Sequence, residues 1–259
     1  MWNTFILSPM VNVLIWIYNF LFHNFGLAII VFTILIRLIT YPLTASQLKS
    51  QKKMTELTTS KKYLEIQKKY KDDKEKLAQE QMKLYQEAGA SPFGACLPTL
   101  IQFPVLIGLY QAIQQAMAAS PVQLFDLSRH VYAFLPNAAS LIPMDNHFLW
   151  LNLGIPDQFF VMPILVAVSM YIQSKMITPP ATGDPQAAQM SQTMTLTMPL
   201  MFGWISLSFP SGLSIYFVIS NLIGIVQTAL TQPVDWKNVF TFSLASKPPA
   251  ADVKTKKKK

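Results

Sequence analysis

A single charged residue lies within a run of eighteen mostly apolar residues, and it limits what the chain can become. The run is Gly26 to Leu43, GLAIIVFTILIRLITYPL. As a helix rising about 1.5 Å per residue it is about 27 Å long, close to the hydrocarbon thickness of a bilayer. The charged residue is Arg37, and a cation at this depth costs about 2.5–3.5 kcal/mol on insertion scales. Two interpretations stay open: the side chain bends out to the headgroups, or it faces a water-filled cavity inside a helix bundle.

The composition of the rest of the chain indicates a polytopic membrane protein. Hydrophobic residues make up 51% of the 259 residues and charged residues 13%, whereas soluble domains are about a quarter charged. The single cysteine, Cys96, excludes an intrachain disulfide and a multi-cysteine metal site. Because no basic region precedes the first apolar run, we expect no cleavable signal.

Apolar runs and turn residues predict an all-α, polytopic integral membrane protein with five transmembrane helices. The predicted spans are residues 26–43, 97–117, 159–177, 194–209 and 213–230. The segments between and after them are predicted as a cytoplasmic helical hairpin (44–96), an extracytoplasmic loop (118–158), a cytoplasmic loop (178–193) and a basic cytoplasmic tail (231–259). Only Pro210, Ser211 and Gly212 join the last two spans, which therefore form a tight antiparallel pair.

Residues 1–25 carry a different pattern. Polar residues recur there at steps of four or close to it, which places them on one helix face: Thr4, Ser8, Asn12, Asn19 and His23. This pattern predicts an N-terminal interfacial amphipathic helix. A short spanning helix is the alternative.

The distribution of basic residues predicts the orientation. Residues 44–96, 175–193 and 231–259 carry 19 of the 21 Lys and Arg residues, and the segments on the other side carry one, Arg129. Cytoplasmic segments are enriched in Lys and Arg, so the bias places the N-terminus outside and the tail in the cytoplasm.

The predicted spans lack the side chains of common membrane enzymes. They contain no Asp or Glu, and the three histidines, His23, His130 and His147, all fall on the outer side. We therefore expect no enzyme, no cofactor and no metal site. The spans offer one cation and neutral hydrogen-bonding groups: Thr33, Thr40, Gln102, Gln111, Gln173, Ser206, Ser208, Ser214, Ser220, Asn221 and Gln227. Each alone is typical of helix packing, and together they are suited to line a hydrated groove.

Four stretches carry a resemblance to a known family. They are LIRLITYPLT at 35–44, KKYKDDKEKLAQEQMKLYQEAGASPFGACLPTLIQFPVLIGLY at 68–110, FLWLNLG at 148–154 and PSGLSIYFVISNLIGIVQ at 210–227. With them the chain resembles the YidC/Oxa/Alb family of membrane protein insertases, bacterial YidC type. The large extracytoplasmic domain common in Gram-negative relatives is absent, which indicates a short form.

The resemblance implies a five-span bundle around a hydrophilic groove that is open to the cytoplasm and the lipid and closed outside. It implies that Arg37 matches the family's groove arginine, which attracts acidic residues of a substrate, and that Gln173 lines the same groove. Residues 44–90 match the first cytoplasmic loop, which receives substrates and meets targeting and translocon components. The candidate substrate-groove residues are Arg37, Gln173, Thr33, Gln102, Gln111, Ser214, Phe217 and Asn221; Phe217 stands where the family often has tryptophan.

The expected function is insertion and chaperoning of nascent membrane proteins in the bacterial plasma membrane, with the lipid bilayer as second partner and no DNA. The basic tail predicts either contact with ribosomal RNA or positive-inside anchoring alone. The alternative function is a small channel or anion-attracting transporter with Arg37 as its selectivity charge. A lipid-binding scaffold would explain the lysines and leave Arg37 unexplained.

Overall fold

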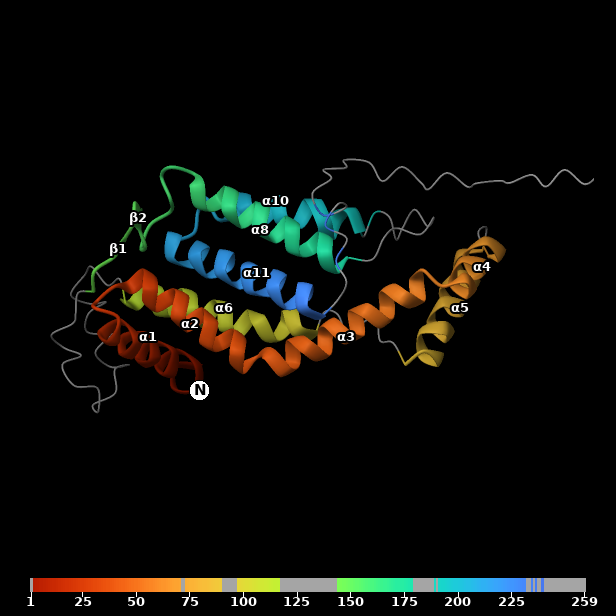
Figure 1. Cartoon of the computed structure of the whole chain (residues 1–259), viewed down its shortest axis with the longest axis horizontal. Coiled ribbons are helices and arrows are strands. Elements are labelled where there is room, and N and C mark those ends of the chain that lie inside the picture. The colour runs from red at the N-terminus through yellow and green to blue at the C-terminus, as the bar shows by residue number, and fades with distance from the viewer. Residues whose placement is uncertain are drawn as a thin grey trace, which may run out of the picture.

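The computed structural model describes residues 2–70, 73–89, 97–116, 144–178, 189, 191–231, 234, 236 and 239. A helical bundle occupies one end of the elongated molecule, and a helical hairpin stands out at the other end (Figure 1). The bundle helices are α1 (Ser8–Phe20), α2 (Phe25–Ile39), α6 (Leu97–Ala116), α8 (Val161–Ile177), α10 (Met198–Ile205) and α11 (Ser211–Thr231). Single π-helical turns, Asn3–Leu7 and Thr193–Thr197, precede α1 and α10.

Helix α11 is the centre of the bundle. It packs against α8 and α2 and also contacts α6. With 21 residues and a mean hydropathy of 1.7, it is the one described helix that is long and apolar enough by itself to cross a membrane. The pair of α2 and α3 (Tyr41–Thr58) reaches the same measure only when counted as one bent span, and α8 and residues 193–205 are shorter apolar helices.

The helix that carries the first predicted span ends at Ile39, before the predicted end of the span at Leu43. Asn24 caps α2, its Oδ1 accepting from the backbone N–H of Leu27 at 3.0 Å, and the helix ends at Ile39. Helix α3 then leaves at an angle of 63°. Pro42 in its first turn explains the break, since proline has no N–H to continue the hydrogen-bond ladder of α2. Residues 40–43, predicted as the end of the span, therefore belong to the bend and to α3.

Helix α1 packs on α2 and α6 and buries two of the five residues of the predicted polar face, whereas Thr4, Asn19 and His23 are exposed. Ser8 and Asn12 are buried, and the Asn12 Nδ2 donates to the Ser8 carbonyl at 2.6 Å, which satisfies a buried polar group locally. Val13, Trp16 and Phe20 are exposed on the opposite side. The predicted polar face is therefore divided between the bundle interior and the surface.

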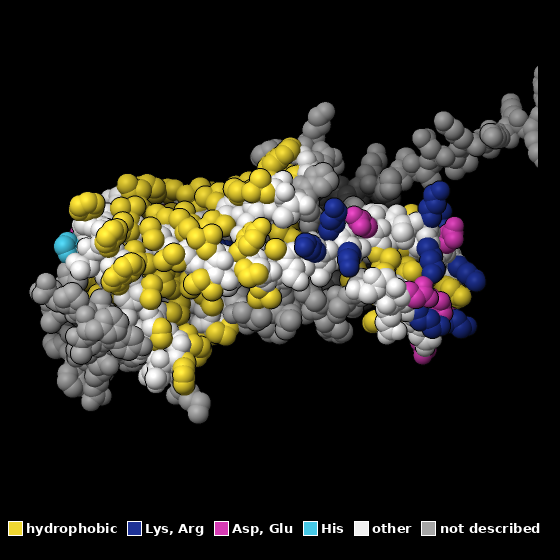
Figure 2. Space-filling model, turned by 60° about the horizontal axis from the view of Figure 1, so that its bottom comes forward, with side chains coloured by type: hydrophobic (Ala, Val, Ile, Leu, Met, Phe, Trp, Pro, Cys, Tyr) yellow, Lys and Arg dark blue, Asp and Glu magenta, His cyan; other side chains and the backbone are white. Residues whose placement is uncertain are grey.

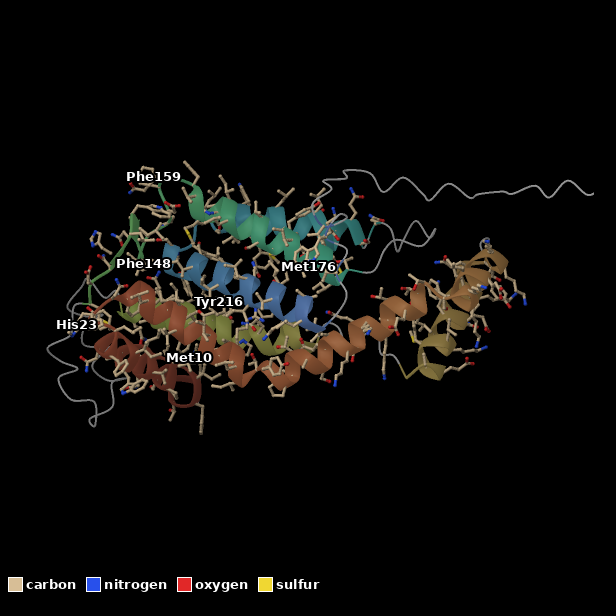
Figure 3. All side chains as sticks on the ribbon, viewed as in Figure 1. Met10, His23, Phe148, Phe159, Met176 and Tyr216 are labelled. Atoms are coloured by element: carbon tan, nitrogen blue, oxygen red, sulfur yellow. The ribbon has the colours of Figure 1, made fainter. Side chains whose placement is uncertain are left out.

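A small β-ladder of β1 (His147–Phe148) and β2 (Leu151–Asn152) lies at the end of the bundle farthest from the hairpin. His23, Phe148 and Phe159 lie at this end, whereas Met176 lies near the opposite end of α8 (Figure 3). The Phe148 ring fills the space where Gly26 lacks a Cβ. The start of α11 is fixed here too, because the N–H of Ser211 donates to the Ile155 carbonyl at 2.8 Å.

Helices α4 (Lys61–Lys69) and α5 (Lys74–Glu87) form the antiparallel hairpin beyond α3. Lys62 and Glu87 join them through an ion pair of 2.7 Å, and the Tyr63 and Tyr85 ring centroids are 6.3 Å apart. Charged side chains gather on this end, and hydrophobic side chains cover the bundle (Figure 2). The surface therefore divides into an apolar body and a charged, water-facing arm.

Several predicted segments fall largely outside the described residues. They are most of the loop 118–158, most of the loop 178–193, residues 90–96 with Cys96, and all but four positions of the tail 231–259. The candidate groove residues all lie within the described ranges.

Candidate substrate groove

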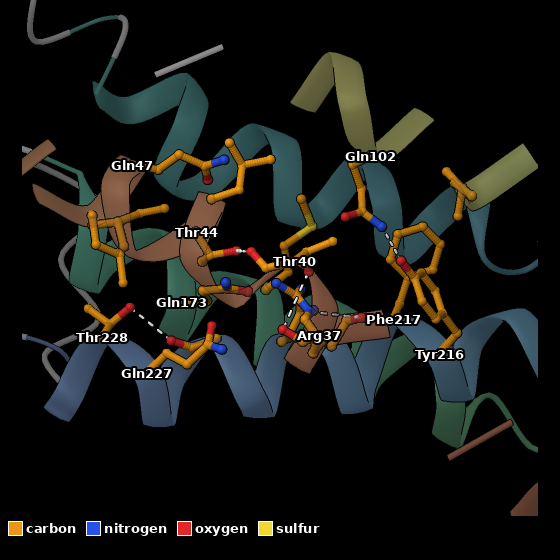
Figure 4. A pocket seen from close by; sticks show the side chains of 18 of the residues that line it. Arg37, Thr40, Thr44, Gln47, Gln102, Gln173, Tyr216, Phe217, Gln227 and Thr228 are labelled. Carbon is orange, nitrogen blue, oxygen red and sulfur yellow. Dashed lines mark hydrogen bonds between the residues drawn. The ribbon is translucent and has the colours of Figure 1, made fainter. Parts of the chain in front are cut away.

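A cavity of about 320 Å³ opens among α2, α3, α6, α8 and α11. Arg37, Gln102, Gln173 and Tyr216 converge on it from four different helices (Figure 4). Its other lining residues are Thr40, Leu43, Thr44, Gln47, Leu48, Gln51, Phe103, Leu106, Met170, Ile177, Phe202, Phe217, Ser220, Asn221, Gly224, Gln227 and Thr228. Hydroxyl and amide groups thus face a space inside an otherwise apolar bundle.

Arg37 turns into this cavity near the end of α2. Its Nε donates to the Ser220 Oγ at 3.4 Å. The described ion pairs all lie elsewhere, in the hairpin and between His147 and Asp145. No Asp or Glu occurs in the six bundle helices. The guanidinium is therefore held by neutral groups, and among the described residues it has no carboxylate partner.

The wall opposite Arg37 is one face of α11. Tyr216, Ser220, Gly224, Gln227 and Thr228 follow each other at the helical spacings of three and four, or adjacent to them. The Gln102 Nε2 donates to the Tyr216 hydroxyl, which connects α6 to this wall (Figure 4). Neutral hydrogen bonds thus order the side chains that surround the cation.

A second contact ties α11 to α8 beside the cavity. The Asn221 Nδ2 donates to the Ser169 Oγ at 3.1 Å, and this hydroxyl donates to the Val166 carbonyl at 3.2 Å. Next to it, the Gln173 amide lies against Gly224, in space that any side chain at position 224 would occupy. Close approach of α8 and α11 here depends on that glycine.

Of the eight candidate groove residues, the structure brings five to the cavity: Arg37, Gln173, Gln102, Phe217 and Asn221. The other three lie away from its lining. Thr33 is fully buried and donates to the Ile29 carbonyl at 2.7 Å. Gln111 accepts at 2.7 Å from the Trp2 Nε1, and Ser214 is buried near the start of α11. Gln111 thus links α6 to the segment before α1, Thr33 bonds within α2, and Ser214 is enclosed in the bundle.

Other lining residues were not among the candidates. Thr40 at the bend and Thr44, Gln47 and Gln51 on α3 continue from the candidate Arg37 at steps of three, four, three and four, and together they form one stripe. Such spacing keeps side chains on one helix face. The stripe was missed because the predicted span ended at residue 43, although the same polar face continues across the bend into α3.

Apolar side chains are exposed beside the polar cavity. On α2 and α3 they include Leu38, Ile39 and Tyr41, and on α8 they include Ile164, Leu165 and Val168. The space-filling view shows hydrophobic side chains spread over this body (Figure 2). Within the described ranges, no cluster of three or more His, Cys, Asp or Glu side chains could hold a metal ion. The chemistry available is hydrogen bonding, one positive charge and apolar contact.

Comparisons with a family sequence profile and with curated proteins identify the same family. Residues 16–237 match the sequence profile of the family described as 60Kd inner membrane protein. Membrane protein insertase MisCA of Bacillus subtilis is 34% identical over 238 residues, which are 91% of this chain and 81% of that protein. Membrane protein insertase YidC 2 of Listeria innocua is 36% identical, covering 88% of this chain and 71% of that protein.

A longer relative matches over part of its length. Membrane protein insertase YidC of Syntrophus aciditrophicus is 37% identical over 227 residues, which are 87% of this chain and 36% of that protein. The aligned region therefore covers nearly all of this chain in each comparison. The chain belongs to the 60Kd inner membrane protein family, in the bacterial YidC type of the YidC/Oxa/Alb insertases, and resembles its short members in extent.

Proposed function

We propose that this protein is an insertase and chaperone for nascent membrane proteins in the bacterial plasma membrane. Five segments span the bilayer in this proposal, namely α2, α6, α8, residues 194–209 with α10, and α11, and the cavity around Arg37 is a groove open to cytoplasm and lipid. The observation that carries the proposal is a cation in a polar cavity, within a bundle that contains no acidic residue. No covalent chemistry is required.

The positive charge supplies the attraction for a client's polar segment. At an effective dielectric constant near 20, a carboxylate about 4 Å from Arg37 gains on the order of 4 kcal/mol. That gain is comparable to the cost of placing arginine in the membrane. An acidic N-terminal tail would therefore enter the groove from the cytoplasm, while the hydroxyl and amide groups of the wall replace part of its hydration.

The apolar segment that follows the tail would leave sideways into lipid. The exposed apolar residues of α8, Ile164, Leu165 and Val168, and those of α11, Leu222, Val226 and Leu230, offer a surface for this passage. About twenty apolar residues gain several kcal/mol on transfer from water into the bilayer. That transfer would drive the step without nucleotide or cofactor.

The proposed topology places the N-terminus outside. Trp2 contacts Gln111, which is five residues, about 8 Å, from the end of α6 at Ala116 and fourteen residues, about 21 Å, from its start at Leu97. In this topology the start of α6 is cytoplasmic, so the chain terminus stays near the outer surface. The exposed apolar residues Val13, Trp16 and Phe20 of α1 suit a helix embedded at this surface among other helices, with these side chains toward lipid.

The two charged regions, the arm and the basic tail, are the proposed binding sites for partners. The arm formed by residues 44–90 is proposed to meet targeting and translocon components, and the basic tail 231–259 to contact ribosomal RNA. An electrostatic tail contact of this kind would weaken steeply with added salt. Membrane insertion gives no reason to expect DNA binding.

The test is insertion of a single-span client with an acidic N-terminal tail into liposomes that hold the purified protein. We expect wild type to insert the client and Arg37→Ala to lose most of that activity. Lys175→Ala is the matched control, because it removes a cation of α8 that does not line the cavity. Ion flux through the same liposomes without client would favour the channel function, and equal insertion by Arg37→Ala would make Arg37 structural.

A further inference from the structure

Two glutamines of the cavity have side-chain oxygens without a hydrogen-bond partner in the protein. They are the Oε1 atoms of Gln51 on α3 and Gln227 on α11, and both atoms are closed off from solvent. Both residues line the same cavity as Arg37. An amide oxygen buried without a donor costs about 1–3 kcal/mol, and folded proteins retain few of them. Two such acceptors in the lining of one cavity therefore indicate a role in binding a donor that the protein itself does not supply.

The two glutamines lie on the path from the hairpin to Arg37. Gln227 is seven residues beyond Ser220, about 10 Å further along α11, and Gln51 is eleven residues beyond the bend at Thr40. Helix α3, which carries Gln51, packs against α11 and leads directly to α4 and α5 (Figure 1). A chain that enters from the cytoplasmic arm passes these residues before it reaches the cation.

The ligand of these acceptors must be a hydrogen-bond donor that clients share. Client side chains vary, but every residue except proline carries a backbone N–H. Lysine and arginine side chains are also donors, yet Arg37 in the same cavity disfavours a second cation. The glutamine amide can also donate to a backbone carbonyl, so one side chain can match both groups of a peptide unit.

We propose that Gln51 and Gln227 bind the backbone of a client's polar tail, accepting hydrogen bonds from its N–H groups. This inference rests on the insertase function and adds a second kind of recognition to it. Arg37 attracts the acidic side chains of the tail, and the glutamines bind the backbone of an extended chain irrespective of its side chains. Rotation about the three flexible bonds of a glutamine side chain brings each oxygen toward the cavity.

The test compares two clients that share the same spanning segment and the same acidic residue. One has an ordinary tail, and the other has prolines at the remaining tail positions and so lacks most backbone N–H donors. The variant Gln51→Met/Gln227→Met keeps side-chain length and removes the acceptors. Loss of two hydrogen bonds predicts about tenfold slower insertion of the ordinary client. The double variant should insert the proline client at a rate within about twofold of the wild-type rate, because this client has few backbone N–H groups for the glutamines to bind.

Gln115→Met is the matched control, because the Gln115 Oε1 on α6 is also buried without a hydrogen-bond partner, yet Gln115 does not line the cavity. It should insert both clients as wild type does. Equal slowing of both clients by the double variant would indicate a packing defect and overturn the proposal, and so would no slowing of either. Failure of the insertase function itself is distinguishable, since wild type would then insert neither client.

Discussion

The side-chain amide of Gln173 on α8 occupies the space that a Cβ atom would need on Gly224 of α11. A Cβ built at position 224 would overlap the Nε2 and lie 2.9 Å from the Cδ of Gln173. Both residues line the cavity. The two helices therefore approach each other at a point where one has no side chain, and the other fills the gap with a polar group.

This relationship predicts opposite effects of one substitution in two backgrounds. Gly224→Ala in wild type should destabilise the protein by about 1–2 kcal/mol, because the Gln173 amide has to move. In a Gln173→Ala background the clash is gone, and the higher helix propensity of alanine should make the same change neutral or stabilising by up to about 1 kcal/mol. Unfolding in detergent, followed by circular dichroism, measures both. Equal destabilisation in the two backgrounds would contradict the packing described.

Charge should matter more than shape at position 37. The Arg37 Nε makes a long hydrogen bond of 3.4 Å with Ser220, which is a weak geometric constraint. Arg37→Lys keeps the charge and should retain most insertion of an acidic client, whereas Arg37→Ala should lose about tenfold or more, given a contact of several kcal/mol. Comparable failure of lysine and alanine would instead indicate that the planar guanidinium is required.

The N-terminus should be accessible from the outside. Asn3 is exposed in the π-helical turn before α1. A membrane-impermeant thiol reagent should therefore label Asn3→Cys in intact cells that carry the Cys96→Ser background. A cysteine at Ser50 on α3, also exposed, should react only after the membrane is opened. The reverse pattern would place the N-terminus in the cytoplasm and make α1 a spanning helix.

The contact between α4 and α5 should weaken in acid. The hydrogen bond and charge of Lys62 hold the pKa of Glu87 below its ordinary value. A carboxyl group with a lowered folded pKa contributes stability above its unfolded pKa, about 4.3, and loses it as pH falls through the folded pKa. Hydrogen exchange of the α4 and α5 amides, corrected for intrinsic rates, should therefore quicken below about pH 4.

Glu87→Gln supplies the control for this pH effect. The variant cannot form the ion pair, so its exchange should respond less to pH over the same interval. Asp73 also has a lowered pKa, through its hydrogen bonds with Lys76, and contributes equally to both proteins. The difference between wild type and variant in the pH dependence of hydrogen exchange therefore reports the contribution of the Lys62–Glu87 pair. Identical pH dependence in the two proteins would exclude a contribution of this pair to the stability of the α4–α5 contact.

The sequence was most informative at positions where one side chain has a large energetic effect on its surroundings. A charge in an apolar run allows few environments, so Arg37 by itself indicated a hydrated cavity as one of two possible surroundings, and Gln173 followed from the family resemblance. Helix ends depend on backbone hydrogen bonds, and Pro42 moved the end of α2 to Ile39 where hydropathy alone continued to Leu43.

Contacts between distant helices were harder to predict. Gln111 carries the same amide as Gln102, yet it bonds to Trp2, 109 residues away, while Gln102 reaches the Tyr216 wall. Their separation of nine residues turns them to different sides of α6. Which side faces the cavity depends on how the other helices pack, and the sequence pattern of one helix does not give that packing. The burial of Thr33 and Ser214 away from the cavity could not be predicted for the same reason.

The bend at Thr40 also has a mechanical consequence. Helix α3 has eighteen residues and is about 27 Å long, and it begins at the bend beside the cavity that it helps to line. A rotation of about 10° at the bend moves the far end of such a helix by about 5 Å and the wall near Thr44 by about 1 Å. If docking at the hairpin rotated α3, a displacement of several ångströms at the tip would change the groove width beside Arg37 by about a fifth of that amount.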